Sequence, residues 1–210
     1  MKNFDNSFLS NDVKLLAGID EAGRGPLAGP VVAASVIFSP SVHISGVNDS
    51  KMLSANRREI LYTEILDKAL DYNVSVVSHA KIDRINILSA TLLAMKNSVK
   101  KLRVKPDLIL LDGNRSFNYN IPVTPVIKGD TKSFCVAAAS ILAKVTRDRI
   151  MNNLSKHYPD YFWEKNKGYP TREHIEVIKR IGPSPLHRRT FLSKIINVSI
   201  QNETNMETAL

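Results

Sequence analysis

The sequence predicts an α/β fold in which helices flank a mixed β-sheet. Short runs of β-branched and apolar residues alternate with stretches of helical period, as is typical of this class. Hydrophobic residues make up 43% of the 210 residues, which is enough for a buried core. The single cysteine, Cys135, excludes an internal disulfide, and its apolar neighbours favour a packed side chain over a nucleophile.

The expected elements follow one another in the order β-β-α-β-α-β-β-α. The apolar, β-branched runs are expected as strands at residues 14–20, 30–38, 73–79, 107–111 and 121–127. Stretches with apolar residues at every third or fourth position are expected as helices at residues 54–71, 87–102 and 133–154. Ser54 is the expected N-cap of the first helix, and Ser133 opens the last.

Composition divides the chain into a main domain and a smaller C-terminal region. Residues 13–157 contain all the expected strands and are assigned to the main domain. Residues 158–198 are aromatic, basic and interrupted by glycine and proline, so we expect a small helical region there. Residues 199–210 are polar and are expected to form a flexible tail.

The charge balance favours a polyanionic partner. The formal charge is +9, from 29 basic and 20 acidic side chains, and nucleic acid is one class of polyanion that such a balance favours. The apolar runs are shorter than the roughly 18 residues expected of a membrane span. The first residues contain no apolar export segment. We therefore expect a cytoplasmic protein without a membrane partner, and we expect a monomer.

The segment GIDEAGRG at residues 18–25 is the strongest local indication of chemistry. An apolar run leads to two adjacent carboxylates, Asp20 and Glu21, and these are followed by Gly23, Arg24 and Gly25. Carboxylates suit hard divalent cations, and an arginine between two glycines suits a phosphate. The segment thus combines a candidate metal site with a candidate anion site, as phosphodiester hydrolysis requires.

Two further strand ends carry acids, Asp112 and Asp130, and both lie next to glycine. Functional residues of α/β sheets gather at strand ends, so these acids can meet Asp20 and Glu21 in one cleft. Four carboxylates together repel one another unless cations such as two Mg²⁺ or Mn²⁺ ions neutralise them. Each acid alone is explained as well by a solvated turn, since Asp-Gly is a common turn pair. Their joint placement favours a metal site.

The motifs resemble those of the prokaryotic ribonuclease HII family from about Leu15 to Phe191. The matching stretches are DEAGRG at 20–25, NDSK at 48–51, DG at 112–113, KGD at 128–130, AAASILAKVTRDR at 137–149, KGYPT at 167–171 with His174, and GPSPLHRR at 182–189. Together they are specific, whereas DG or KGD alone would be a weak signal.

This resemblance implies a ribonuclease H-like fold with Asp20, Glu21, Asp112 and Asp130 as catalytic metal ligands for Mn²⁺ or Mg²⁺. It also implies that Gly23, Arg24 and Gly25 surround the ribonucleotide 2′-hydroxyl and the neighbouring phosphate. The 2′-hydroxyl is the group that distinguishes RNA from DNA.

In the family a tyrosine at the position of Tyr169 stacks on the deoxyribose that follows the ribonucleotide. The small C-terminal region would therefore recognise the substrate. We further expect phosphate contacts from Lys51 and Lys144, although Lys144 and Asp148 also have the spacing of a simple surface ion pair. The segment from His187 to Arg189 is a candidate contact to the nucleic-acid backbone, whereas His174 is expected to be structural.

The leading hypothesis is a metal-dependent endonuclease that acts on RNA–DNA hybrids and on single ribonucleotides in duplex DNA. It would leave 3′-hydroxyl and 5′-phosphate ends, because water attacks in place of the 2′-hydroxyl. A DNA resolvase- or integrase-like nuclease of the same fold is an alternative, but it would not need the Gly-Arg-Gly loop or Tyr169. A non-catalytic, basic nucleic-acid-binding module is a third possibility, and it requires that the four acids lie apart.

Overall fold

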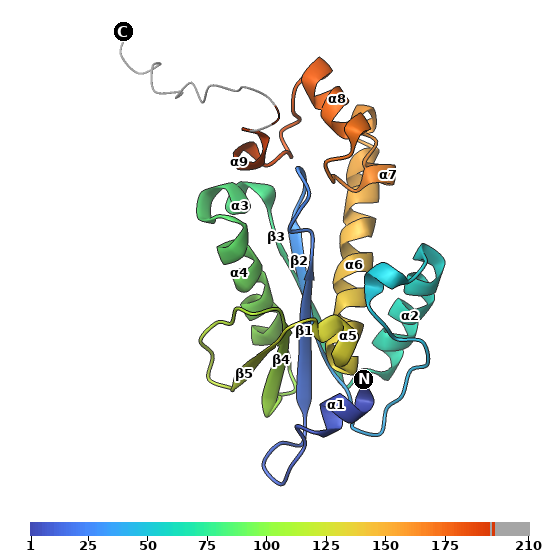
Figure 1. Cartoon of the computed structure of the whole chain (residues 1–210), viewed down its shortest axis with the longest axis vertical. Helices are drawn as coiled ribbons and strands as arrows, with labels where there is room; N and C mark the ends of the chain where they lie inside the picture. Colours follow the sequence, from blue (N-terminus) through green and yellow to red (C-terminus); the bar gives the residue numbers. More distant parts are fainter. Residues whose placement is uncertain (194, 196–210) are drawn as a thin grey trace.

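The computed structural model describes residues 1–193 and 195 and forms a mixed sheet with helices on both faces (Figure 1). The sheet has five strands in the order β3-β2-β1-β4-β5. In chain order they are β1 (Leu16–Ala22), β2 (Val31–Ile37), β3 (Asp71–Val77), β4 (Leu108–Asp112) and β5 (Val123–Val126). The α/β prediction with a mixed sheet is confirmed, and the strands lie within a few residues of their expected positions.

Strand β1 is central and connects the two halves of the sheet. It pairs with β2 in antiparallel fashion and with β4 in parallel, while β5 extends the parallel part beyond β4. The carboxyl ends of β1, β4 and β5 therefore lie at the same edge of the sheet. This edge is where the sequence places its acidic residues.

Two layers of helices bury the two faces of the sheet (Figure 1). One layer consists of α2 (Ala55–Lys68) and the long α6 (Phe134–Ser155). The opposite layer consists of α3 (His79–Ile85) and α4 (Ile87–Lys100). Side chains alternate along β1, so Leu16 packs in the α6 core and Ala17 in the α4 core.

Helix α6 lies unusually close to β1 at one glycine. A Cβ atom added to Gly18 would lie 2.1 Å from the backbone carbonyl carbon of Cys135. No side chain fits there, so the glycine permits the close approach of helix and strand. This contact places the first turn of α6 directly beside the strand that carries Asp20.

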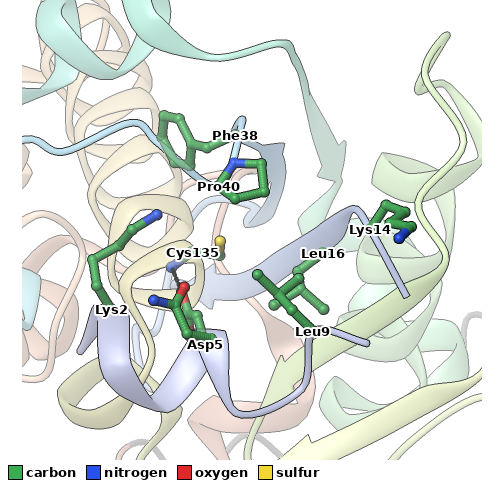
Figure 2. Close-up of a pocket in the computed structure, with 9 residues that line it drawn as sticks. Lys2, Asp5, Leu9, Lys14, Leu16, Phe38, Pro40 and Cys135 are labelled. Carbon is green, nitrogen blue, oxygen red and sulfur yellow. Dashed lines mark hydrogen bonds between the residues drawn. The ribbon is translucent and has the colours of Figure 1, made fainter. Parts of the chain in front are cut away.

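The structure contains a short N-terminal helix, α1 (Lys2–Asn6), that the sequence did not predict. Figure 2 shows its Asp5 beside Cys135, where the carboxylate accepts the backbone N–H of Cys135 at 3.0 Å. The acidic side chain thereby complements the positive end of α6. Cys135 is buried, as expected of a packed cysteine, and burial raises the pKa of its thiol well above the ordinary value.

Helix α3 was also missed, because it is short and lies close before α4. Ser78 caps its N-terminus by accepting the N–H of Lys81. Asn86 then adopts a positive φ of 63° and caps α4 with its own side chain. The expected helix at 87–102 corresponds to α4, and α3 occupies the stretch before it for which no helix was expected. The expected caps of the other helices, Ser54 and Ser133, are confirmed.

The C-terminal region is helical, as predicted. Its short elements are η2 (Pro159–Tyr161), α7 (Trp163–Asn166), α8 (Arg172–Ile181) and α9 (Arg189–Leu192). They pack around the buried Trp163 and against Met151 at the end of α6. The expected tail at 199–210 lies outside the described residues. None of the helices within the described part is long and apolar enough to cross a membrane.

The loop at 23–30 is held between the sheet and the C-terminal region. The N–H of Leu27 donates to the carbonyl of Gly168 at 2.7 Å, and Arg188 donates its own N–H to Leu27 at the same distance. Ala28 also forms an isolated bridge with His187. Segments more than 130 residues apart in the sequence therefore share one backbone network.

Candidate active site

Three aspartates converge at the carboxyl edge of the sheet. Asp20 lies near the end of β1, Asp112 ends β4, and Asp130 lies in the short helix α5 (Gly129–Lys132), which follows β5. One carboxylate oxygen from each lies within 4.8 Å of the others. Carboxylate oxygens are the donors that Mg²⁺ and Mn²⁺ prefer, so this donor set fits such an ion.

Backbone hydrogen bonds hold these carboxylates in place. An Asp112 oxygen accepts the N–H of Gly129 at 2.6 Å, which joins β4 to the first residue of α5. An Asp20 oxygen accepts the N–H of Glu21 at 2.7 Å. Lys128 turns the chain into α5 in the left-handed conformation, with φ of 56°. The positions of the acids thus depend on the backbone as well as on side-chain packing.

The aspartate cluster is electrostatically unfavourable without a cation. Asp20 and Asp130 are only 5% and 6% exposed. Burial raises the pKa of Asp20 well above its ordinary value, and the neighbouring charges of Glu21 and Asp112 raise it further. The pKa of Asp112 is raised by burial and by Asp130. A bound cation would relieve this repulsion and favour the ionised carboxylates.

Lys51 supplies a positive charge at the edge of the cluster. Its ammonium lies 3.3 Å from an Asp130 oxygen. Burial lowers the pKa of Lys51, but the attraction of Asp130, Asp49 and Asp20 outweighs this effect and the pKa is raised overall. Lys51 lies in the short turn η1 (Ser50–Met52), which also brings it to the wall of the cleft described below.

Glu21 lies beside the three aspartates but is not part of the group whose oxygens approach within 4.8 Å, as far as the described residues show. Its carboxylate pairs instead with Arg24 at 3.4 Å. Burial raises the pKa of Glu21, and the positive charge of Arg24 partly offsets this increase. Successive side chains of a strand point to opposite faces, which explains why Asp20 and Glu21 diverge.

A cleft of about 500 Å³ opens over the carboxylates. Its lining combines carboxylates, the glycine-rich loop and basic side chains: Asp20, Glu21, Ala22, Gly23, Arg24, Gly25, Ser50, Lys51, Arg58, Asp112, Lys144 and Tyr169. Most of the residues that were singled out from the sequence therefore meet in one place. Asp130 borders this set through its contact with Lys51.

Tyr169 lines the same cleft as the carboxylates and is 39% exposed. A Cβ atom on Gly25 would lie 3.7 Å from its ring, so the tyrosine and the glycine-rich loop are neighbours. The Lys144 ammonium lies 5.9 Å from the ring centroid, and it also forms a 2.7 Å ion pair with Asp148. The surface ion pair that the spacing of these two residues indicated is thus present.

The structure corrects the expectation that His187 and Arg188 contact nucleic acid. Both side chains are buried, and the Arg188 guanidinium bonds to backbone carbonyls. Arg147 on α6 is likewise buried. Basic residues normally indicate surface charge, but here the carbonyl groups of the 23–30 loop replace water around the two arginines, and the His187 ring bonds to Ser184 and His174. The structural role expected for His174 is confirmed, since it is fully buried and hydrogen-bonded to Trp163.

Arg58 lies on α2 and lines the cleft, although its sequence context did not indicate a role there. Its guanidinium donates to the carbonyls of Ser50 and Leu53 at 2.9 and 2.6 Å. These bonds hold the turn that carries Lys51. Nothing in the spacing of Arg58 on an amphipathic helix distinguishes it from a solvated charge.

A mixed sheet that gathers three aspartates at its edge, beneath a cleft with basic and glycine-rich walls, defines a nuclease of the ribonuclease H fold. Comparison with known proteins narrows this class. The model of the family described as Ribonuclease HII matches residues 17–194. This chain belongs to the ribonuclease HII family.

Curated relatives agree with this assignment. The chain is 51% identical over 209 residues to Ribonuclease HII of Endomicrobium trichonymphae, with 97% of each chain covered. It is 52% identical over 183 residues to Ribonuclease HII of Acetivibrio thermocellus, and the match covers 87% of this chain and 72% of the relative.

Solved structures support the same fold. Ribonuclease H2 from Pyrococcus horikoshii superimposes with a TM-score of 0.72 and 32% identity, over 86% of this chain and 96% of that one. RNase HII of Archaeoglobus fulgidus, solved in complex with PCNA, gives a TM-score of 0.69 and 31% identity, over 83% and 94% of the two chains. Bst-RNase HIII, solved with Mn²⁺, shares the fold at 20% identity, with a TM-score of 0.61 over 82% and 64% of the two chains.

Proposed function

We propose that this protein hydrolyses the RNA strand of RNA–DNA hybrids and cuts on the 5′ side of single ribonucleotides in duplex DNA. One observation carries the proposal: three aspartates with mutually close oxygens share a cleft with a Gly-Arg-Gly loop and an exposed tyrosine. The acids suit phosphodiester hydrolysis, and the other two features suit recognition of a ribose within DNA.

Asp20, Asp112 and Asp130 would hold a divalent cation, and Glu21, which lines the same cleft, would contribute to a second. A bound Mg²⁺ or Mn²⁺ would supply an activated water and would stabilise the leaving 3′ oxygen, so that the products carry 3′-hydroxyl and 5′-phosphate ends. The chain itself contributes a rigid arrangement, since Gly129 donates to Asp112 and thereby fixes one of the acids.

The Gly-Arg-Gly loop would bind the sugar-phosphate backbone next to the scissile bond. Arg24 carries a planar guanidinium that suits bidentate contact with a phosphate, and its pairing with Glu21 places it beside the acids. Gly23 has a positive φ of 99°, and a Cβ atom there would lie 2.1 Å from Nε of Arg147, so this glycine lets the loop pack against that arginine. Gly25 brings main-chain groups close to the substrate because no side chain stands in the way. These contacts would position the ribonucleotide over the carboxylates.

Tyr169 would stack on the deoxyribose that follows the ribonucleotide and so recognise the RNA–DNA junction. Its exposed ring lies beside Gly25, which is the place such a contact requires. Lys51 and Lys144 line the same cleft and would contact phosphates. Residues 158–198 would then act as the substrate-reading region beside a catalytic domain at 13–157. Because one chain supplies the whole lining, we propose that a monomer is the functional unit.

A cleavage assay with two duplexes tests the proposal. One duplex contains a single embedded ribonucleotide, and the other has the same sequence in DNA alone. We expect metal-dependent cleavage of the first only, on the 5′ side of the ribonucleotide, with a 3′-hydroxyl at the new end. Equal cleavage of the all-DNA duplex would favour a resolvase- or integrase-like activity, and binding without cleavage in either metal would contradict an enzymatic role.

A further inference from the structure

Arg188 is completely buried beneath the glycine-rich loop, with 0% of its surface exposed. Its guanidinium donates hydrogen bonds of 2.6–3.1 Å to the carbonyl oxygens of Gly23, Arg24, Gly29 and Pro30. All four acceptors belong to a single loop that lies about 160 residues earlier in the sequence. One side chain therefore holds both ends of the loop.

Within residues 1–193 and 195, Arg188 forms no direct ion pair with an aspartate or glutamate, and the charge of Asp83 acts on it only from a greater distance. Burial lowers its pKa to about 9, and the nearby charge of Arg147 contributes to the decrease. The group still carries its proton at neutral pH. A buried cation without a carboxylate in contact is costly, so its carbonyl contacts must compensate for the lost water.

The hydrogen bonds to Gly23 and Arg24 determine the direction of two peptide groups. In a planar trans peptide the carbonyl and the following N–H point in opposite directions. Since the carbonyls of Gly23 and Arg24 face Arg188, the N–H groups of Arg24 and Gly25 point away from it. Both residues line the cleft and Arg188 does not. Neither N–H donates to a described backbone or side-chain acceptor.

We propose that Arg188 is a positioning residue for substrate recognition, and that it presents the N–H groups of Arg24 and Gly25 to an oxygen acceptor of the bound nucleic-acid backbone. The proposal rests on the function proposed above. The acceptor is either the ribose 2′-hydroxyl or a phosphate oxygen, and these two sources share one chemistry. Arg188 does not touch the substrate itself but acts through the loop.

Arg147 provides a matched control. It is also buried, at 1% exposure, and its guanidinium donates to backbone carbonyls, namely those of Ala28, Pro30 and Lys167. None of these bonds involves the carbonyl of Gly23 or Arg24. Replacing either arginine by lysine keeps a positive charge but removes the multiple hydrogen bonds of the guanidinium. Arg147 also packs against Gly23, since a Cβ atom there would lie 2.1 Å from its Nε. The two variants therefore separate the hydrogen bonds to the carbonyls of Gly23 and Arg24, which only Arg188 makes, from packing against the same segment.

The test measures metal-free binding to the single-ribonucleotide duplex and to the all-DNA duplex. We expect Arg188→Lys to weaken binding of the ribonucleotide duplex about tenfold, equivalent to about 1.4 kcal/mol, and Arg147→Lys to weaken it much less. A loss confined to the ribonucleotide duplex assigns the acceptor as the 2′-hydroxyl, and an equal loss on both assigns a phosphate. Wild-type binding by Arg188→Lys, or the same loss in both variants, would overturn the proposal.

Amide resonances of the wild-type chain provide a readout that needs no variant to fold. Adding the ribonucleotide duplex should shift the ¹⁵N–¹H signals of Arg24 and Gly25, and unchanged signals in a saturated complex would overturn the proposal. Measurements on the free protein distinguish a failure of this inference from a failure of the proposed function. If the wild type shows no preference for a ribonucleotide, the proposed function fails. A larger shift of these two signals in free Arg188→Lys than in free Arg147→Lys would still support the loop orientation.

Discussion

The Nε2 atoms of His174 and His187 lie 3.1 Å apart in the core of the C-terminal region. Nδ1 of His187 accepts the N–H of Ser184 at 2.9 Å, so its proton is on Nε2 and faces His174. Nε2 of His174 also accepts the indole N–H of Trp163, so its own proton is on Nδ1 and is donated to the Tyr169 carbonyl at 2.9 Å. The bonds that Nδ1 of His187 and Nε2 of His174 accept require both rings to be neutral.

The histidine pair predicts a loss of stability on acidification. Burial lowers the pKa of His187 from 6.5 to about 4, and the charge of His174 adds to this effect. Between these values the unfolded chain binds a proton that the folded chain does not, so the free energy of unfolding falls as pH falls. The difference between the unfolded and folded pKa values of His187 corresponds to a loss of at most about 3 kcal/mol in the free energy of unfolding. Chemical denaturation at pH 7 and pH 4.5 measures the difference.

Two variants isolate this contribution. His187→Asn keeps an acceptor for the Ser184 N–H but cannot titrate, so its stability should depend less steeply on pH over this interval. His157→Asn removes an exposed histidine and serves as the control. If His187→Asn keeps the pH dependence of the wild type, the buried neutral pair does not account for it.

Asp20→Asn should stabilise the metal-free protein. The substitution preserves an oxygen that accepts the Glu21 N–H, and it removes a buried charge whose pKa is raised by burial and by neighbouring carboxylates. We expect a gain on the order of 1 kcal/mol, or about 2–4 °C in Tm. Thermal unfolding with EDTA and with Mn²⁺ checks this, because added Mn²⁺ should raise the Tm of the wild type more than that of the variant. A lower Tm in EDTA would contradict the assigned repulsion.

Tyr169→Ala should impair cleavage at a single embedded ribonucleotide more than cleavage within a long RNA–DNA hybrid. A lone ribonucleotide must be recognised through its junction with deoxyribose, whereas a hybrid offers many 2′-hydroxyls. Loss of stacking should cost about 1–3 kcal/mol on the junction substrate. Tyr169→Phe keeps the ring and should remain near the wild type. Equal decreases in kcat/KM on the two substrates would make Tyr169 a general structural residue.

Arg24→Lys should retain more activity than Arg24→Ala and less than the wild type. Lysine preserves the positive charge beside Glu21, which forms a 3.4 Å pair with Arg24. It cannot form the two parallel hydrogen bonds that a guanidinium offers to a phosphate. Comparison of kcat/KM for the three proteins on the single-ribonucleotide duplex tests this order. An alanine variant as active as the wild type would exclude Arg24 from substrate binding.

The sequence predicted the sheet and the aspartate cluster because both follow from local patterns. Asp20 and Asp112 terminate apolar runs, and parallel strands place such ends together. The separation of Glu21 from the cluster follows from the alternation of side chains along a strand. This rule can be applied to the sequence alone. The order of strands in the sheet, by contrast, depends on tertiary pairing that no single run of residues specifies.

The burial of Arg188 was not predictable in the same way. A basic pair after proline and leucine is typical of an exposed loop, and the acceptors of Arg188 lie about 160 residues away. Helix α1 escaped prediction because five residues are too few to show a helical period. In both cases long-range packing outweighs the local pattern.

Asp112→Asn offers the most direct test of the proposed metal-dependent active site. The variant keeps a side-chain oxygen for the Gly129 N–H but removes a negative charge from the three-aspartate cluster. We predict that cleavage of the single-ribonucleotide duplex falls by at least about a thousandfold in saturating Mg²⁺ or Mn²⁺, while the Tm stays at or above that of the wild type in EDTA. Cleavage at a rate near that of the wild type in either metal would contradict the proposed metal-dependent active site.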